Sequence, residues 1–156
     1  HYKIRVTKDH LVFCSGHFIS YEGDRCERLH GHNYRTAIEI EGPLDPQSWY
    51  VFDFIATKQH ARAITDQLDH RMMLPLNNPV ITLDYEGKDV RVRYKDRQWV
   101  FPRDDCVFLP IENTTAELLS QYVYEEVERR LAEQERVRVA RVEVWETETS
   151  CAIFER

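Results

Sequence analysis

Residues 26–32 carry the side chains of this chain that are best suited to metal chemistry, and they end in His30-Gly31-His32. Two residues that are two positions apart in a strand point to the same side. Both imidazoles can therefore aim at one point, while Gly31 leaves the opposite face without a side chain. The spacing would equally suit hydrogen-bonded surface histidines, so it leaves metal binding open.

An upstream histidine, His17, extends this pair to a candidate metal centre. It shares its parity with Leu11 and Phe13, which predicts a strand with one buried side over residues 11–18. Pairing of this strand with the next would bring three neutral imidazoles together, and Zn²⁺ is the ion best suited to such a set. Three protein ligands leave one coordination position open, as in catalytic zinc sites.

Three further side chains could move protons. Cys26 lies four residues before His30, and a nearby cation would favour its thiolate as a base or nucleophile. The same spacing allows a zinc ligand or an inert core cysteine. Asp69 precedes His70 and could fix the tautomer of that imidazole, although a histidine that complements a helix C-terminus would give the same pair.

Glu146 places a carboxylate at the end of a core-facing row that contains Val142 and Val144. A buried carboxylate needs hydrogen-bond donors. The amide and amino groups of a pterin or guanine edge would supply them, and so would backbone N–H groups. Glu117 has first the role of a capping-box residue, with any ligand role second.

The elements that must position these residues alternate between two hydrophobic periodicities. Strands are predicted over residues 11–18, 30–41, 137–146 and 150–154. One helix is predicted from the N-cap Asp53 to Leu68, and a second begins at the capping box Thr114–Glu117. Small hairpins are predicted over residues 80–101. This order favours an α+β fold with an antiparallel sheet and helices on one side.

Length and charge exclude several classes of protein. The chain has 156 residues, which predicts a single domain over 1–156 that needs neither metal nor disulfide to fold. Its formal net charge of −6 argues against a nucleic-acid binder. We find neither a membrane span nor a signal peptide, so a cytoplasmic location is expected. The four widely spaced cysteines do not resemble a disulfide framework.

Five separated motifs together resemble the 6-pyruvoyl-tetrahydropterin synthase / 6-carboxytetrahydropterin synthase family. In chain order they are Phe13-Cys14-Ser15-Gly16-His17, residues 26–32, Leu68-Asp69-His70, Asn113-Thr114-Thr115-Ala116-Glu117 and Glu146-Thr147. The resemblance implies a four-stranded antiparallel sheet with two helices on one face, known as the tunnelling or T-fold. It also implies a homo-oligomer, commonly a hexamer of two trimers, with active sites at subunit interfaces.

The resemblance also implies a role for each candidate residue. His17, His30 and His32 would hold Zn²⁺, Cys26 would be the proton-abstracting base, and Asp69 with His70 would be its acid/base partner. Glu146 would anchor the pterin ring, assisted by Thr115 and Glu117. The substrate would be 7,8-dihydroneopterin triphosphate.

The product is the point on which subgroups of this family differ. The three-residue gap between Cys26 and His30 resembles the queuosine-pathway enzyme, which forms 6-carboxy-5,6,7,8-tetrahydropterin, acetaldehyde and triphosphate. The alternatives are triphosphate elimination to 6-pyruvoyl-tetrahydropterin, a non-catalytic pterin-binding zinc module, and a purely structural zinc protein. Two departures from compact members are an insertion over residues 79–108 and Thr114, which stands where proline is common.

Overall fold

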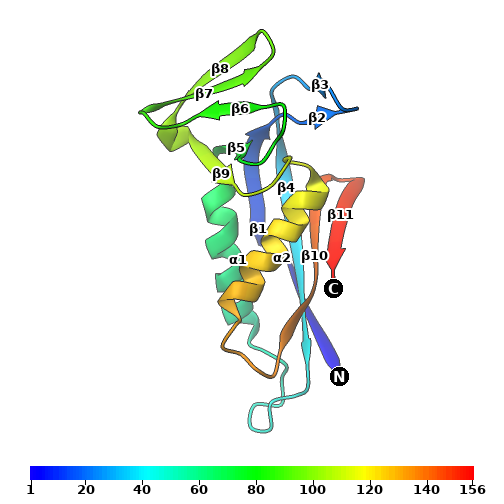
Figure 1. Ribbon diagram of the computed structural model, residues 1–156. Helices are drawn as coiled ribbons and strands as arrows, with labels where there is room; N and C mark the ends of the chain where they lie inside the picture. The colour runs from blue at the N-terminus through cyan, green and yellow to red at the C-terminus, as the bar shows by residue number, and fades with distance from the viewer.

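A six-stranded mixed sheet carries two helices on one face in the computed structural model, which describes residues 1–156 apart from the side chains of residues 8–10 (Figure 1). The elements in chain order are β1 (Tyr2–His17), β2 (Ser20–Tyr21), β3 (Arg25–Cys26), β4 (His30–Gly42), α1 (Phe54–Leu68), β5 (Arg71–Pro75), β6 (Thr82–Asp84), β7 (Asp89–Tyr94), β8 (Arg97–Pro102), a 3-10 turn η1 (Arg103–Asp105), β9 (Cys106–Leu109), α2 (Ala116–Arg130), β10 (Arg138–Thr147) and β11 (Ser150–Glu155).

The sheet is larger than the four antiparallel strands that the sequence predicts. Its order is β11-β10-β4-β1-β5-β9, and the first four strands are antiparallel as expected. The short strands β5 and β9 then extend it by parallel pairing, β5 with β1 and β9 with β5. Both are brief runs of five and four residues, so neither shows enough alternation to distinguish it from a loop.

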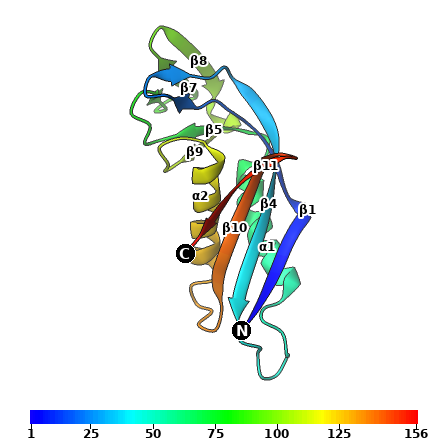
Figure 2. The ribbon, with the colours of Figure 1, turned by 90° about the vertical axis from the view of Figure 1, so that its right-hand side faces the viewer.

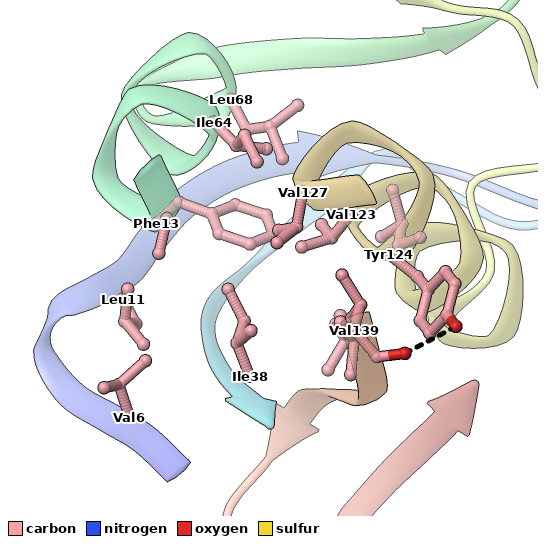
Figure 3. Close-up of a cluster of buried hydrophobic side chains, with 14 of the residues drawn as sticks. Val6, Leu11, Phe13, Ile38, Ile64, Leu68, Val123, Tyr124, Val127 and Val139 are labelled. Atoms are coloured by element: carbon pink, nitrogen blue, oxygen red, sulfur yellow. Dashed lines mark hydrogen bonds between the residues drawn. The ribbon is translucent and has the colours of Figure 1, made fainter. Parts of the chain in front are cut away.

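The main core lies between this sheet and the two helices (Figure 2). Leu68 from α1 and Val123 from α2 face Phe13 and Ile38 from the sheet, and all four are at most 1% exposed (Figure 3). Burial of each such side chain contributes roughly 1.5–3 kcal/mol to the free energy of unfolding. The helices are thereby held against the sheet face that carries the alternating apolar residues.

The two helix starts were predicted with different success. Asp53 caps α1 as predicted, because its side chain accepts a hydrogen bond from the Ala56 N–H. The predicted capping box of α2 is wrong by one residue: Thr115, not Thr114, is the N-cap and accepts from the Leu118 N–H. Thr114 is instead fully buried. Because its hydroxyl does not cap the helix, it is free to contact the site described below.

The predicted hairpins form a separate three-stranded antiparallel sheet of β6, β7 and β8. It packs on a second core cluster whose buried members are Phe18, Met72, Leu74, Ile81, Val90, Val92 and Cys106. Both ribbon views place this sheet beside β2 and β3, at one end of the main sheet (Figures 1 and 2). In the part of the chain that the structure describes, no helix is long and apolar enough to cross a membrane.

Candidate metal centre and active site

Three histidines converge where the end of β1 meets the start of β4. His17 pairs with His30 in the antiparallel register, and Ser15 pairs with His32. The ligand nitrogens of the three imidazoles all lie within 4.8 Å of one another. Three nitrogens bound to one zinc ion at ~2.0–2.1 Å would lie roughly 3.4 Å apart in a tetrahedral site. The predicted histidine triad is therefore present and close enough to hold a metal ion.

Backbone carbonyls orient two of these imidazoles. The Nδ1 atom of His17 lies 2.9 Å from the carbonyl oxygen of Thr114, and that of His30 lies 2.8 Å from the carbonyl oxygen of Arg28. A carbonyl can only accept, so each Nδ1 must donate its proton. The lone pair then resides on Nε2, which is the arrangement that second-shell partners impose on metal-binding histidines.

The Nε2 atom of His17 has no hydrogen-bond partner within the described chain, although the residue is only 1% exposed. The pKa of His17 is lowered to about 4: burial is the largest cause, the bond to the Thr114 carbonyl opposes it, and the neighbouring His30 and His32 add to the lowering. The imidazole is therefore neutral at pH 7. A buried polar atom without a partner is costly, and a bound metal ion would use this lone pair.

Glu146 reaches the same centre from the neighbouring strand β10. Its Oε1 atom lies 3.6 Å from Nε2 of His17 and 3.5 Å from Nε2 of His32. Glu146 and Glu117 also line a cavity of about 320 Å³ between the start of α2 and β11. Thr115, by contrast, uses its hydroxyl to cap α2. The structure thus brings the predicted carboxylates to one cavity beside the triad.

Cys26 lies in β3 and is not a member of the group of metal-ligating side chains found in the described residues. Its thiol is half-buried and donates to the carbonyl oxygen of Glu27 over 3.5 Å. Burial raises the pKa of the Cys26 thiol above its usual value, and the positive charge of Arg97 opposes this shift.

The pair Asp69 and His70 lies at the C-terminal end of α1. Asp69 accepts from the Cys14 N–H at 2.8 Å, and its other oxygen lies 2.8 Å from Nδ1 of His70. The bond from Cys14 lowers the pKa of Asp69 below its usual value. The His70 side chain is 82% exposed and lines an open groove of about 510 Å³, together with Cys14 and Gly16.

Cys14 and Gly16 have the opposite parity from the buried His17 on β1, but His30 of the triad is also among the residues that line this groove. The polar contacts of Asp69 and His70 join them to each other and to Cys14, not to the triad. Within the described residues, the predicted acid/base pair therefore makes no polar contact with the triad of its own chain, although His70 and His30 line the same groove.

Two residues at the site were not predicted from the sequence. Thr114 supplies both a carbonyl and a hydroxyl oxygen to His17 Nδ1, at 2.9 Å and 3.2 Å. Glu27 places a carboxylate oxygen 4.0 Å from Nε2 of His30 and accepts from the Ile19 N–H at 3.1 Å. The hydrophobic periodicity contains no signal for either contact.

Comparisons with known proteins agree in one family. The family model described as 6-pyruvoyl tetrahydropterin synthase matches residues 5–156. The 6-carboxy-5,6,7,8-tetrahydropterin synthase of Aquifex aeolicus is 29% identical, with 96% of this chain and 89% of that protein covered. The enzyme of the same name from Haemophilus influenzae is 26% identical, with 94% of each chain covered.

A solved structure shows the same relationship in three dimensions. The crystal structure of 6-pyruvoyl tetrahydropterin synthase from Plasmodium vivax matches with a TM-score of 0.88 at 28% identity. The match covers 99% of this chain and 97% of that one. It therefore extends over the histidine triad, Glu146 and the three-stranded sheet alike.

Proposed function

Because the chain belongs to the 6-pyruvoyl tetrahydropterin synthase family, we propose that it is a zinc-dependent pterin carbon–oxygen lyase. Its substrate would be 7,8-dihydroneopterin triphosphate, which with water gives 6-carboxy-5,6,7,8-tetrahydropterin, acetaldehyde and triphosphate, a step of queuosine and 7-deazaguanine biosynthesis. The observation that carries this proposal is the buried Nε2 atom of His17, which has no hydrogen-bond partner in the described chain and lies beside two further imidazoles.

The donor set fits zinc because it offers three neutral imidazole nitrogens from His17, His30 and His32. When bound, zinc would act as a Lewis acid that acidifies the side-chain hydroxyls of the substrate. Glu146 would hold the N–H groups of the pterin ring, since a carboxylate is a strong acceptor for such a paired donor edge. Glu117 lines the same cavity and would assist, with Thr115 next to it at the start of α2.

Proton transfer would require a base and an acid on opposite sides of the substrate carbon. Cys26 would abstract the proton, and a cation bound at the triad would counteract the upward pKa shift that burial imposes on its thiol. Asp69 orients the His70 imidazole through its contact of 2.8 Å, so His70 could return a proton.

Asp69 and His70 make no polar contact with the triad of their own chain in the described residues, which supports a homo-oligomer in which the pair serves the metal centre of a neighbouring subunit. The main sheet leaves β9 and β11 as its edge strands, and Ile153 in β11 is 47% exposed. Unpaired edges favour association with another chain. A trimer-based assembly such as a hexamer of two trimers would cover them.

The choice of product rests on three observations, which do not all point in the same direction. The curated relatives from Aquifex aeolicus and Haemophilus influenzae carry the 6-carboxy name and favour the first product. The solved structure from Plasmodium vivax carries the 6-pyruvoyl name, which makes triphosphate elimination to 6-pyruvoyl-tetrahydropterin the second candidate. The three-residue gap between Cys26 and His30 favours the first.

A product assay separates these candidates. Zinc-loaded protein is incubated with 7,8-dihydroneopterin triphosphate, and the products are identified by mass spectrometry. We expect 6-carboxytetrahydropterin with one acetaldehyde for each triphosphate, whereas triphosphate without acetaldehyde would indicate the 6-pyruvoyl product. The Cys26→Ala variant should bind pterin and zinc without turnover. Absence of triphosphate release from the zinc-loaded wild type would contradict the catalytic proposal and favour a non-catalytic pterin-binding module or a purely structural zinc protein.

A further inference from the structure

The hairpin formed by β7 and β8 makes hydrogen bonds and an ion pair with the segment of the chain that carries Cys26. At one end, the Tyr94 hydroxyl donates to the carbonyl oxygen of Asp24, and Nζ of Lys95 lies 2.9 Å from the Asp24 carboxylate. At the other end, Nη1 of Arg97 lies 3.2 Å from the carbonyl oxygen of Cys26, and Nη2 lies 3.3 Å from that of Glu27. These contacts join residues about 70 positions apart, and they hold the chain at Asp24, before Cys26, and at the carbonyls of Cys26 and Glu27.

The Arg97 guanidinium is itself held in place by an aromatic side chain. Its central carbon lies 4.7 Å from the centre of the Trp99 ring, a cation–π contact. Trp99 in turn stacks on Phe18 with ring centres 4.3 Å apart. Phe18 is only 2% exposed and directly follows His17, the buried histidine of the triad. Arg97 thus connects the Cys26 segment to the rigid end of β1.

The Cys26 segment has little support of its own. The ladder of β2 and β3 consists of two residue pairs, Ser20 with Cys26 and Tyr21 with Arg25. Its turn contains Glu22 and Gly23, both with positive φ. An isolated two-stranded hairpin is at best marginally stable in water. External contacts must therefore determine where the Cys26 sulfur lies relative to the histidines.

We propose that the β6–β8 sheet is a positioning device for Cys26, with Arg97 as the positioning residue that fixes the two consecutive carbonyls of Cys26 and Glu27. The inference rests on the proposed function, in which Cys26 is the proton-abstracting base. An arginine suits the task because its planar fork donates to two consecutive carbonyls at once, which a lysine ammonium cannot reproduce with the same geometry. Its charge also opposes the effect of burial on the Cys26 pKa.

The test combines turnover with the chemical reactivity of Cys26 in the zinc-loaded protein. For Arg97→Gln we expect kcat to fall roughly 10- to 100-fold, the cost of a small misplacement of a reacting group. KM and zinc content should stay near the wild-type values. The pH at which iodoacetamide alkylates Cys26 at half its maximal rate, followed by peptide mass mapping, should move upward because a cation is lost. Arg97→Lys should restore this pH while recovering only part of kcat.

The matched control is Arg93→Gln, which removes the same charge from an exposed position on the same hairpin. It should leave both kcat and the alkylation profile unchanged. The alkylation readout needs no turnover, so it tests the inference even if the wild type proves not to be a lyase. An unchanged alkylation profile in Arg97→Gln, or an equal change in Arg93→Gln, overturns the inference.

A second variant decides the matter if Arg97→Gln does not fold. Tyr94 is 6% exposed, so Tyr94→Phe keeps the buried ring and removes only the hydroxyl that donates to Asp24. We expect a lower kcat at unchanged zinc content and an altered alkylation rate at Cys26. Wild-type behaviour on both measurements would show that the hairpin does not position the thiol.

Discussion

Thr114 and His17 are joined by two contacts to one nitrogen: Nδ1 of His17 lies 2.9 Å from the Thr114 carbonyl oxygen and 3.2 Å from its hydroxyl oxygen. Both residues are at most 1% exposed. The residue that immediately precedes the N-cap of α2 therefore fixes the ring of the most deeply buried histidine in the triad. The position of the start of α2 and the orientation of the His17 ring therefore depend on each other.

Substitution of the two adjacent threonines should separate these roles. Thr114→Val removes the hydroxyl but keeps the carbonyl, so zinc affinity should fall by roughly 10-fold, the low end for the loss of such a second-shell partner. Thr115→Val removes the helix cap, so it should lower the free energy of unfolding by about 1 kcal/mol and leave zinc affinity unchanged. Zinc titration and urea denaturation of both variants measure this, and equal effects of the two on zinc affinity would contradict it.

Glu146→Gln should weaken pterin binding far more than zinc binding. The neutral amide loses the charge-assisted bonds to the pterin edge, so we expect pterin affinity to fall by roughly 10-fold or more. Zinc affinity should change little because the three imidazoles remain. Calorimetric titration with each ligand measures both effects, and Glu148→Gln, a change at a side chain that is 86% exposed, is the control. Equal losses for pterin and zinc would refute the assigned role.

Mixing two inactive variants should restore activity if Asp69 and His70 serve a neighbouring subunit. Cys26→Ala and His70→Ala oligomers are each expected to be inactive. After dissociation and reassembly at equal amounts, roughly a quarter of the interface sites should combine an intact Cys26 with an intact His70. Triphosphate release by the mixture measures this. Failure of reassembled mixtures to recover activity would place the acid/base pair and Cys26 in the same chain.

The sequence predicted the parts of this site that depend on local periodicity. Alternation predicted that His30 and His32 share a face and that His17 lies on the buried side of its own strand, because the side-chain period of a strand is fixed at two. The pairing of β1 with β4, which periodicity alone does not establish, brings the three together. The Asp53 cap was also predicted, because a cap acts within one turn of its helix and so depends only on the local sequence.

The remaining features depend on contacts between distant segments. Thr114 has a good capping pattern around it, and only the packing of α2 against β1 decides that its hydroxyl contacts His17 instead. Arg97 meets Cys26 across 71 positions, and nothing in the hydrophobic pattern of its hairpin indicates that contact. The strand β5 is defined by its pairing with β1 and β9 by its pairing with β5, not by their own short sequences.

Glu143 should make stability depend on pH in the acid range. Its carboxylate is 4% exposed and accepts from Arg5 at 2.7 and 2.8 Å. These bonds are the largest cause, with further bonds from Trp145 and Arg141, of the lowering of its pKa from 4.5 to about 2. A depressed pKa stabilises the fold above pH 4.5, and this contribution is lost as the pH falls towards 2. Glu143→Gln should therefore lower the free energy of unfolding by about 2 kcal/mol at pH 7.

The difference in the free energy of unfolding between wild type and Glu143→Gln should decrease steadily as the pH falls from 4.5 to about 2. Urea denaturation at pH 7, 4 and 2.5 measures it. A gap that stays constant over this range would show that the ion pair with Arg5 is not the source of the stabilisation.

Removal of the metal should abolish turnover and leave the fold intact. The core consists of apolar side chains from α1, α2 and the sheet, so the folded state does not depend on the histidines. Zinc that binds only the native protein should raise the melting temperature by a few degrees through mass action. Calorimetry of chelated and zinc-loaded protein should thus show two cooperative transitions of similar enthalpy. Loss of the cooperative transition on chelation would mean that the metal is structural, and the open coordination position at His17, His30 and His32 would then have no catalytic role.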